Sequence, residues 1–253
     1  MYMKPIAFLI IFLVAAHAAF SSAEQVTLVK ANKAYSVGSY TVAADLYQKV
    51  VEAGYASPEL YYNLGNTYFK MNDHARAILW YERSRRLDPG NEDVNFNLNV
   101  ANTKISDKIE PLPELFYKRW FNGLVMLFSV DTWAMISICT FIAGLLGLVL
   151  YLASRVLILR KIGFWAASGL FLLTASAMAL AWSGYHVTIS NSEAIVFAPT
   201  ITVKSSPDDK STDLFVLHEG TKVRLLDNIS GWYEIRIANG SVGWLPESSL
   251  EKI

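Results

Sequence analysis

The side chains that most often carry catalysis or bind metals are scattered in this sequence. The four histidines have no metal-ligand spacing to one another, and they stand at His17, His74, His186 and His218. The single cysteine, Cys139, cannot form an intramolecular disulfide. The sequence also lacks a phosphate-binding Gly-Lys loop, a Gly-x-Ser-x-Gly elbow and a Cys-x-x-Cys pair. We therefore predict that the protein is not an enzyme and has no catalytic residues, no metal site and no cofactor.

Two sets of side chains offer the chemistry of recognition instead. The first set can hold an extended peptide through amide and aromatic groups, and it comprises Asn32, Tyr35, Tyr62, Asn63, Asn66 and Lys70. The second set is centred on one tryptophan with charged neighbours, and it comprises Trp232, Glu234, Arg236 and Trp244. An amide hydrogen bond contributes about 1 kcal/mol net, and tryptophans are frequent binding hot spots. Both sets predict the binding of proteins or short peptides.

The overall composition is that of a membrane protein with no electrostatic preference for nucleic acid. Hydrophobic residues make up 53% of the chain and charged residues 17%. The 22 basic and 22 acidic side chains balance to a formal net charge of zero, so the basic surface that nucleic-acid binding requires is not expected. We therefore exclude nucleic acid as a partner and expect membrane lipid as one.

Two long apolar segments organise the rest of the chain. Residues 132–154 and 162–185 contain no Asp, Glu, Lys or Arg, and each exceeds the ~20 residues that an α-helix needs to cross a bilayer. We predict that they form a two-helix transmembrane hairpin. Because charged side chains are missing from both segments, a transport path through them is not predicted.

The loop between these helices, residues 155–161, carries three basic side chains, Arg155, Arg160 and Lys161. Basic loops are retained in the cytoplasm, so both flanking domains should lie on the other side of the membrane. Lys118 and Arg119 oppose this orientation, but they form the smaller group and have acidic neighbours. We predict that the protein lies in the bacterial inner (cytoplasmic) membrane, with both soluble domains facing the periplasm.

The N-terminal segment, residues 1–23, has the order of a secretory signal peptide. Lys4 precedes a short apolar run over residues 6–16, and Ser21 and Ala23 have the spacing of a cleavage site. An uncleaved anchor is the alternative interpretation. Either form exports the segment that follows, in agreement with the basic loop.

Residues 24–106 repeat with a period of 34, because Ala43 and Tyr47 recur as Ala77 and Tyr81. The second copy has small, aromatic and proline residues at the spacing of the tetratricopeptide signature: Tyr61, Leu64, Gly65, Tyr68, Ala77, Tyr81 and Pro89. The segment therefore resembles a tetratricopeptide domain, an α-solenoid in which small residues let paired helices cross closely.

Residues 91–106 begin a third unit that lacks a second helix. An apolar stripe at helical spacing predicts that this helix caps the solenoid, and it comprises Val94, Leu98, Ala101 and Ile105. The same helix has four asparagines that form either a solvated face or the wall of a binding groove: Asn95, Asn97, Asn99 and Asn102.

The predicted groove resembles the tetratricopeptide carboxylate clamp only in part. Asn32 and Asn63 match the asparagine positions of that clamp, whereas Leu28 and Asp93 stand where two of its lysines would be. The resemblance therefore implies binding of an extended segment rather than capture of a terminal carboxylate.

Residues 107–131 join the repeats to the membrane. A boundary with two prolines at residues 110–113 precedes an amphipathic helix over residues 114–130, whose Phe116 and Trp120 should lie at headgroup depth. Asp131 is predicted to cap the first membrane helix.

From residue 190 to residue 253 the pattern changes to short strands separated by turns. Two glycine-tryptophan steps, ending at Trp232 and Trp244, resemble those of a bacterial SH3 domain, which implies a small all-β barrel. The Asn239-Gly240 pair predicts a hairpin with a two-residue turn.

Strand alternation assigns the side chains of residues 232–237 to two faces. Tyr233, Ile235 and Ile237 should point into the core, and Trp232 should point outward with Glu234 and Arg236. An outward Trp232 is either a platform for a ligand or covered by a neighbouring loop.

The order of signal peptide, tetratricopeptide repeats, membrane hairpin and SH3-like domain is similar to that of the BatE-like proteins in the Bat aerotolerance family. The resemblance covers the whole chain and depends on the combination of modules. The resemblance implies that the protein functions in the cell envelope together with other Bat proteins. Those proteins carry von Willebrand A-type domains and are associated with a MoxR-type ATPase. It also implies a role linked to aerotolerance or stress.

The sequence thus predicts a multi-domain membrane protein: an α-solenoid, a transmembrane hairpin and a small SH3-like barrel. The first functional hypothesis is that the protein is an envelope scaffold or adaptor that binds partner proteins through both soluble domains. The alternative is a cell-wall sensor or targeting protein whose SH3-like domain binds peptidoglycan peptides.

Overall fold

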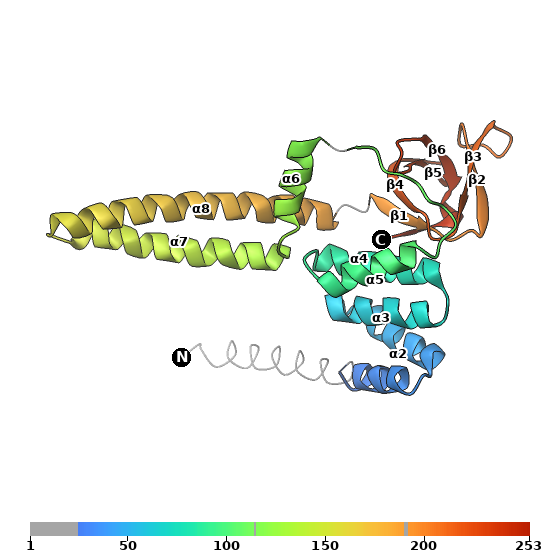
Figure 1. The fold of residues 1–253 in the computed structure, drawn as a ribbon, viewed down its shortest axis with the longest axis horizontal. Helices are drawn as coiled ribbons and strands as arrows, with labels where there is room; N and C mark the ends of the chain where they lie inside the picture. The colour runs from blue at the N-terminus through green and yellow to red at the C-terminus, as the bar shows by residue number, and fades with distance from the viewer. Residues whose placement is uncertain (1–24, 114, 190–191) are drawn as a thin grey trace, which may run out of the picture.

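The computed structural model describes residues 25–113, 115–189 and 192–253. The predicted signal peptide, residues 1–23, lies outside the described residues. A helical domain and a β-sheet domain lie together at one end of the molecule, and a long two-helix hairpin extends away from them (Figure 1).

The helical domain is a stack of antiparallel helices. Residues 25–36 form the first described helix, and four more follow: α2 (Tyr40–Glu52), α3 (Pro58–Lys70), α4 (His74–Leu87) and α5 (Glu92–Asn102). Three of these helices begin where a polar side chain accepts a backbone N–H at the N-terminus, and the capping residues are Ser57, Asp73 and Asn91. Local sequence therefore defines where these three helices start.

Close packing within the second repeat depends on Gly65. A Cβ at this position would lie 2.5 Å from Cδ1 of Tyr81, which is almost fully buried. The capping helix α5 buries Val94, Leu98 and Ala101, and Ile105 packs half-buried against the same core. The apolar stripe of the third unit therefore covers the second repeat.

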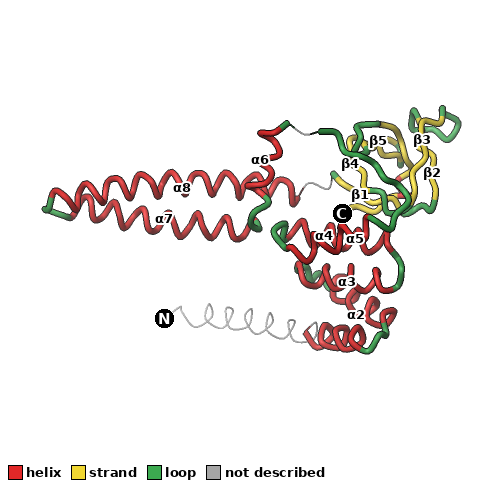
Figure 2. The backbone as a smooth tube through the Cα atoms, viewed as in Figure 1, coloured by secondary structure: helices red, strands yellow, loops and turns green. Residues whose placement is uncertain are grey.

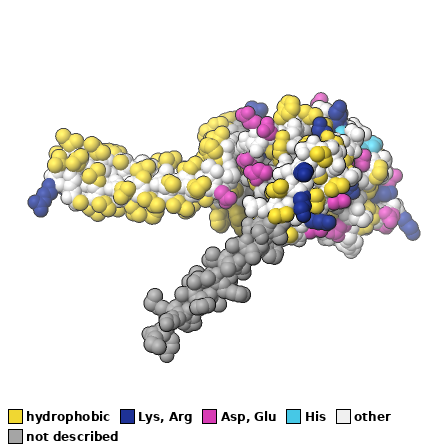
Figure 3. Space-filling model, turned by 90° about the horizontal axis from the view of Figure 1, so that it is seen from below, with side chains coloured by type: hydrophobic (Ala, Val, Ile, Leu, Met, Phe, Trp, Pro, Cys, Tyr) yellow, Lys and Arg dark blue, Asp and Glu magenta, His cyan; other side chains and the backbone are white. Residues whose placement is uncertain are grey.

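The hairpin consists of α7 (Val130–Ala153) and α8 (Leu157–Ile189), preceded by the short helix α6 (Phe116–Val125). Both long helices are long and apolar enough to cross a membrane. They pack through small residues, since a Cβ at Gly147 would lie 3.3 Å from Cβ of Ala167. Apolar side chains cover the hairpin surface, and Lys and Arg side chains gather at its far tip (Figure 3).

The structure corrects three details of the predicted hairpin. The loop at the tip covers residues 154–156 rather than 155–161, because α8 already begins at Leu157 and includes Arg160 and Lys161. Basic side chains are compatible with a helix, so they did not mark its boundary.

The other two corrections concern the start of the hairpin. Ser129, and not Asp131, caps α7, because its side chain accepts the N–H of Thr132. Asp131 lies two residues further on, in the first helical turn. The amphipathic helix α6 ends at Val125, and a turn separates it from α7.

The C-terminal domain is one antiparallel sheet with the strand order β3-β2-β6-β5-β4-β1-β7. The strands are β1 (Glu193–Val196), β2 (Thr200–Lys204), β3 (Asp213–His218), β4 (Lys222–Ile229), β5 (Trp232–Arg236), β6 (Val242–Pro246) and β7 (Leu250–Lys252). A short 3-10 helix, Glu247–Ser249, precedes β7. Its buried core comprises Ala194, Val196, Val203, Leu217, Val223, Ile235, Ile237 and Leu245.

The predicted two-residue turn at Asn239-Gly240 is wrong. Ile237 and Ser241 close a longer loop, in which the N–H of Gly240 donates to the carbonyl oxygen of Ile237 at 2.9 Å. A two-residue type I′ turn needs a positive φ at both central residues. Of Asn239 and Gly240, only Gly240 has one, with φ at 90°.

The helical and sheet domains share a packed boundary. Ile195 of β1 and Ile253 are buried in the same apolar cluster as the core of the repeats. The segment that leaves α5 runs along the sheet domain before it reaches α6 (Figure 2). On this path Ile105 packs directly on Gly220, and the N–H of Leu112 donates to the carbonyl oxygen of Ala238 at 3.0 Å.

Candidate functional site

The helical domain has an open groove of about 300 Å³ lined by aromatic, amide and basic side chains. The residues that line it are Tyr35, Tyr62, Asn66, Phe69, Lys70, Tyr81, Asn97 and Val100. Four of the six predicted groove residues are therefore brought together: Tyr35, Tyr62, Asn66 and Lys70. Asn32 and Asn63 are not among the lining residues.

The amide of Asn66 is held by a hydrogen-bond network inside this groove. Its Oδ1 accepts the Tyr81 hydroxyl at 2.7 Å and Nδ2 of Asn97 at 3.0 Å. The same Nδ2 donates to the Tyr62 hydroxyl at 2.9 Å. Asn66 and Asn97 thus shape the wall of the groove, and the Tyr62 hydroxyl retains its own hydrogen for a ligand.

The first repeat contains a hydrogen bond equivalent to the one between Tyr81 and Asn66. The Tyr47 hydroxyl donates to Oδ1 of Asn32 at 2.6 Å, so Asn32 supports the first repeat. Burial is the main cause that raises the pKa of Tyr47 to about 12, and it raises the pKa of Tyr81 as well. Both tyrosines therefore remain protonated donors at neutral pH.

The asparagines of α5 divide between the two roles that the sequence left open. Asn97 faces the groove, whereas Asn99 and Asn102 are exposed away from it. Asn95 instead donates from Nδ2 to the carbonyl oxygen of Pro89 at 3.0 Å, which fixes the turn before α5. One amide of the run contributes to a binding surface.

In the sheet domain, Trp232, Glu234 and Arg236 share one face of β5. In the register with β6, Glu234 lies opposite Trp244 and Trp232 lies opposite Pro246. Trp232 and Trp244 are therefore diagonal neighbours on the same face, a separation that aromatic side chains can bridge. Both are half-buried, so part of each ring reaches solvent.

The opposite face of β5 points into the sheet core. Ile235 and Ile237 are buried, and Tyr233 packs half-buried against the same cluster. The hydroxyl of Tyr233 donates to Glu247 at 3.4 Å. The strand therefore has an aromatic outer face and an apolar inner face.

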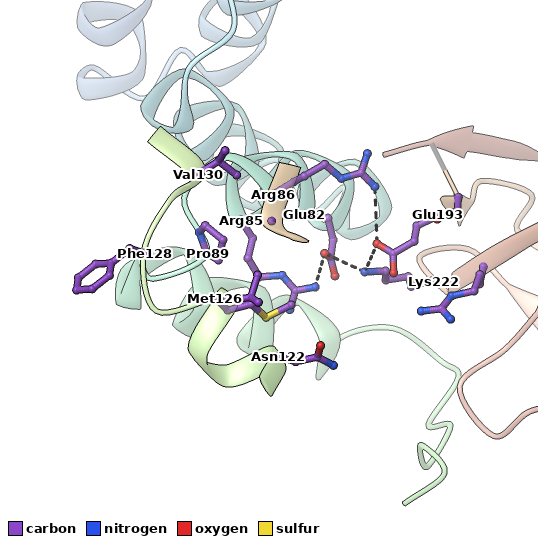
Figure 4. Close-up of a pocket in the computed structure, with 14 residues that line it drawn as sticks. Glu82, Arg85, Arg86, Pro89, Asn122, Met126, Phe128, Val130, Glu193 and Lys222 are labelled. Atoms are coloured by element: carbon purple, nitrogen blue, oxygen red, sulfur yellow. Dashed lines mark hydrogen bonds and ion pairs between the residues drawn. The ribbon is translucent and has the colours of Figure 1, made fainter. Parts of the chain in front are cut away.

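An ion-pair network between α4 and the sheet domain was not predicted from the sequence. Glu82 lies 2.6 Å from the guanidinium of Arg85 and 3.2 Å from Nζ of Lys222. Lys222 also lies 2.8 Å from Glu193, and Arg86 lies 3.7 Å from the same carboxylate (Figure 4). Lys222 and Glu193 are far in sequence from the α4 residues, so only the fold brings the two groups together.

Charge complementarity holds this network ionised. Burial opposes the ionisation of Glu193, but Lys222, by charge and hydrogen bond, and then Arg86 hold the pKa of Glu193 below its ordinary value. Burial lowers the pKa of the Arg86 guanidinium, while the nearby carboxylates of Glu193 and Glu82 act to raise it. The network therefore fixes the sheet domain against the repeats through charged groups.

The described residues contain no group of three or more His, Cys, Asp or Glu side chains that could hold a metal ion. The surfaces above present amide, aromatic and charged groups, which suit the recognition of peptides.

Comparison with protein families gives a match for the helical domain and one for the sheet domain. Residues 28–92 match the model of a tetratricopeptide repeat, and residues 199–251 match the model of a bacterial SH3 domain. A comparison with curated proteins gives no match. The chain therefore joins tetratricopeptide repeats to a bacterial SH3 domain through two long apolar helices.

Proposed function

We propose that the protein is a membrane-anchored envelope scaffold that binds an extended segment of a partner protein in the groove of its repeats. The role is non-catalytic: the protein positions its partner at the membrane surface. Tetratricopeptide repeats and bacterial SH3 domains both suggest binding of proteins or peptidoglycan.

The observation that carries this proposal is the open groove lined by residues from the helix over residues 25–36, from α3 and from α5. The surface of α4 is occupied by the sheet domain through Arg83, which donates to the carbonyl oxygen of Lys252 at 2.7 Å, and through the ion pairs of Glu82. Tyr35, Tyr62 and Lys70, in contrast, line an open surface. These groups supply two aromatic rings and a flexible cation for a peptide segment.

Membrane anchorage is supported by the surface of the hairpin. Large apolar side chains are exposed along both helices, and examples are Leu146, Leu152, Trp165 and Leu172. Such a surface in water would have a large hydrophobic cost. The basic tip formed by residues 155–161 supports a cytoplasmic loop, and hence a periplasmic location for both soluble domains in a bacterial inner membrane.

The resemblance to BatE-like proteins of the Bat aerotolerance family suggests which partners to test. We propose that the groove binds another Bat envelope protein, one with a von Willebrand A-type domain. The complex would act in aerotolerance or in the response to envelope stress.

The groove can be tested without disturbing its framework. Asn66 is an unsuitable target, because its loss would leave Tyr81 and Asn97 without their acceptor. Tyr35→Ala with Lys70→Glu changes two lining side chains, one half-buried and one exposed. The tagged full-length variant should recover the partner from membranes at least tenfold less than the wild type. Lys49→Glu, an exposed charge change on α2 outside the groove, should recover it fully.

The paired tryptophans favour a second candidate function. Trp232 and Trp244 form an aromatic outer face with Glu234 and Arg236 beside them, and such a face can bind a peptidoglycan peptide through stacking and charge. In that case the protein would be a cell-wall sensor or targeting protein. Retention of the full chain on purified peptidoglycan, and its loss in Trp232→Ala, would support this candidate over the scaffold.

A further inference from the structure

A second cavity, of about 340 Å³, lies where all parts of the molecule meet. Its walls come from α4, the junction of α6 and α7, the end of α8, and strands β1 and β4 (Figure 4). The residues that line it are Glu82, Arg85, Arg86, Pro89, Asn122, Val125, Met126, Phe128, Val130, Gly184, Ser192, Glu193, Lys222 and Arg224. One side of the cavity is closed because the end of α8 packs tightly against the start of α7. A Cβ added at Gly184 would lie only 3.1 Å from Cγ2 of Val130.

One wall of this junction cavity is charged, with positive charge in excess. Four cationic side chains line it against two carboxylates, which leaves two positive charges over. Both carboxylates are engaged by Lys222, and Arg85 pairs with Glu82. Arg224 is exposed and forms no ion pair with another described residue, so its guanidinium is available to an anion. Guanidinium groups bind phosphate with two parallel hydrogen bonds.

The rest of the lining is largely apolar. It includes Val125, Met126, Phe128 and Val130. Next to it α6 exposes large aromatic rings, among them Phe116, Trp120 and Phe121. Aromatic side chains with basic neighbours are typical of the membrane–water interface. A ligand in this cavity would thus meet both positive charge and apolar side chains.

We propose that the junction cavity binds the phosphate headgroup of an anionic phospholipid, whose acyl chains lie along α6, α7 and α8. This inference rests on the proposed membrane anchorage, because only then does the cavity lie at headgroup depth. The positive excess attracts a phosphate diester, which carries one negative charge, and the cavity volume is within the range of small-ligand sites. A bound lipid would stabilise the contact between the repeats, the sheet domain and the hairpin.

The test uses full-length protein in nanodiscs or neutral detergent and native mass spectrometry. Dioleoyl phosphatidylglycerol should be retained in preference to dioleoyl phosphatidylcholine. Arg224→Glu should weaken phosphatidylglycerol retention about fivefold or more. Arg85→Gln should weaken it in the same direction, and Lys49→Glu should leave it unchanged. Thermal unfolding of each variant checks that the fold is retained.

Several results would overturn the lipid site. One is equal retention of the two lipids, and another is equal retention of phosphatidylglycerol by Arg224→Glu and the wild type. If inorganic phosphate alone displaces the lipid at a similar concentration, the site binds a free anion rather than a lipid headgroup. The groove variant Lys70→Glu should retain lipid normally, so a failure of partner binding is distinguished from a failure of the lipid site. Flotation with liposomes reports separately on anchorage.

Discussion

Oδ1 of Asp107 lies 2.7 Å from Nδ1 of His218, and Oδ2 of the same carboxylate accepts the backbone N–H of His218 at 2.8 Å. Thr221 donates its hydroxyl to Oδ2 at 2.6 Å. Asp107 belongs to the segment that leaves the last repeat helix, so one carboxylate ties the repeats to the SH3-like domain. Burial opposes its ionisation, but the hydrogen bonds from Thr221 and His218 hold the pKa of Asp107 below 3.8.

Replacement of Asp107 by alanine should weaken the contact between the two soluble domains. His218 and Thr221 would lose their acceptor, and hydrogen bonds to a charged group contribute about 1.5 to 3 kcal/mol. We expect the free energy of unfolding to fall by about 2 kcal/mol at pH 7, measured by thermal unfolding of the full chain. Glu110→Ala, an exposed carboxylate in the same segment, should change it little. Equal stability of Asp107→Ala and the wild type would contradict this role.

The same contact should depend on pH in a defined direction. Because the folded pKa of Asp107 lies below its ordinary value of 3.8, its stabilisation is complete above that value. It is lost as the pH falls through the lower, folded pKa. The difference in stability between Asp107→Ala and the wild type should therefore be present at pH 5 and shrink as the buffer is made strongly acidic. A difference that keeps its full size in strongly acidic buffer would contradict the assignment.

Alanine at Gly65 should destabilise the repeats. The added Cβ would lie 2.5 Å from the buried ring of Tyr81, and overpacking of this kind costs about 1 to 3 kcal/mol. The melting temperature of the helical domain, followed by circular dichroism, should fall. Gly123→Ala is the matched control, because nothing lies within 4 Å of the added Cβ in α6. An unchanged melting temperature for Gly65→Ala would show that the two helices can separate at no cost.

The repeats and the strand faces were predictable because their signals are local. The period of 34 residues reappears in the structure as two equivalent hydrogen bonds, from Tyr47 to Asn32 and from Tyr81 to Asn66. Alternation over residues 232–237 correctly placed Ile235 and Ile237 in the core. Each of these patterns needs only neighbouring residues or one repeat to be recognised.

The junctions between domains were not predictable. Asp107 lies 111 residues from His218, and Glu82 lies 140 residues from Lys222. Nothing near either carboxylate in the sequence indicates its partner. The loop after Ile237 was mispredicted for a related reason, since the Asn239-Gly240 pair suits more than one turn and the flanking strand register decides between them.

Labelling of introduced cysteines tests the orientation of the hairpin. In a Cys139→Ser background, Ser154→Cys at the tip should resist an impermeant thiol reagent in intact spheroplasts, because we expect it in the cytoplasm. Asp208→Cys in the loop between β2 and β3 should react. Permeabilised spheroplasts should label both positions, which shows that each thiol is accessible. Labelling of Ser154→Cys alone in intact spheroplasts would reverse the proposed topology.

Trp232→Ala tests the outer face of the SH3-like domain. Loss of a hot-spot aromatic costs about 2 kcal/mol, roughly a thirtyfold loss of affinity. Retention on purified peptidoglycan, or on a peptide partner, should fall accordingly while the domain remains folded. Leu245→Ala removes a fully buried side chain and should unfold the domain instead. If Trp232→Ala also unfolds it, Trp232 supports the core and the binding surface lies elsewhere.

The scaffold proposal is tested most directly by quantitative affinity purification after cross-linking in native membranes. A tagged wild-type chain should recover an envelope protein with a von Willebrand A-type domain. The Tyr35→Ala, Lys70→Glu double variant should recover at least tenfold less of it, with unchanged helicity and melting temperature, and Lys49→Glu should match the wild type. Equal recovery by the folded double variant and the wild type would contradict the claim that the groove of the repeats binds the partner.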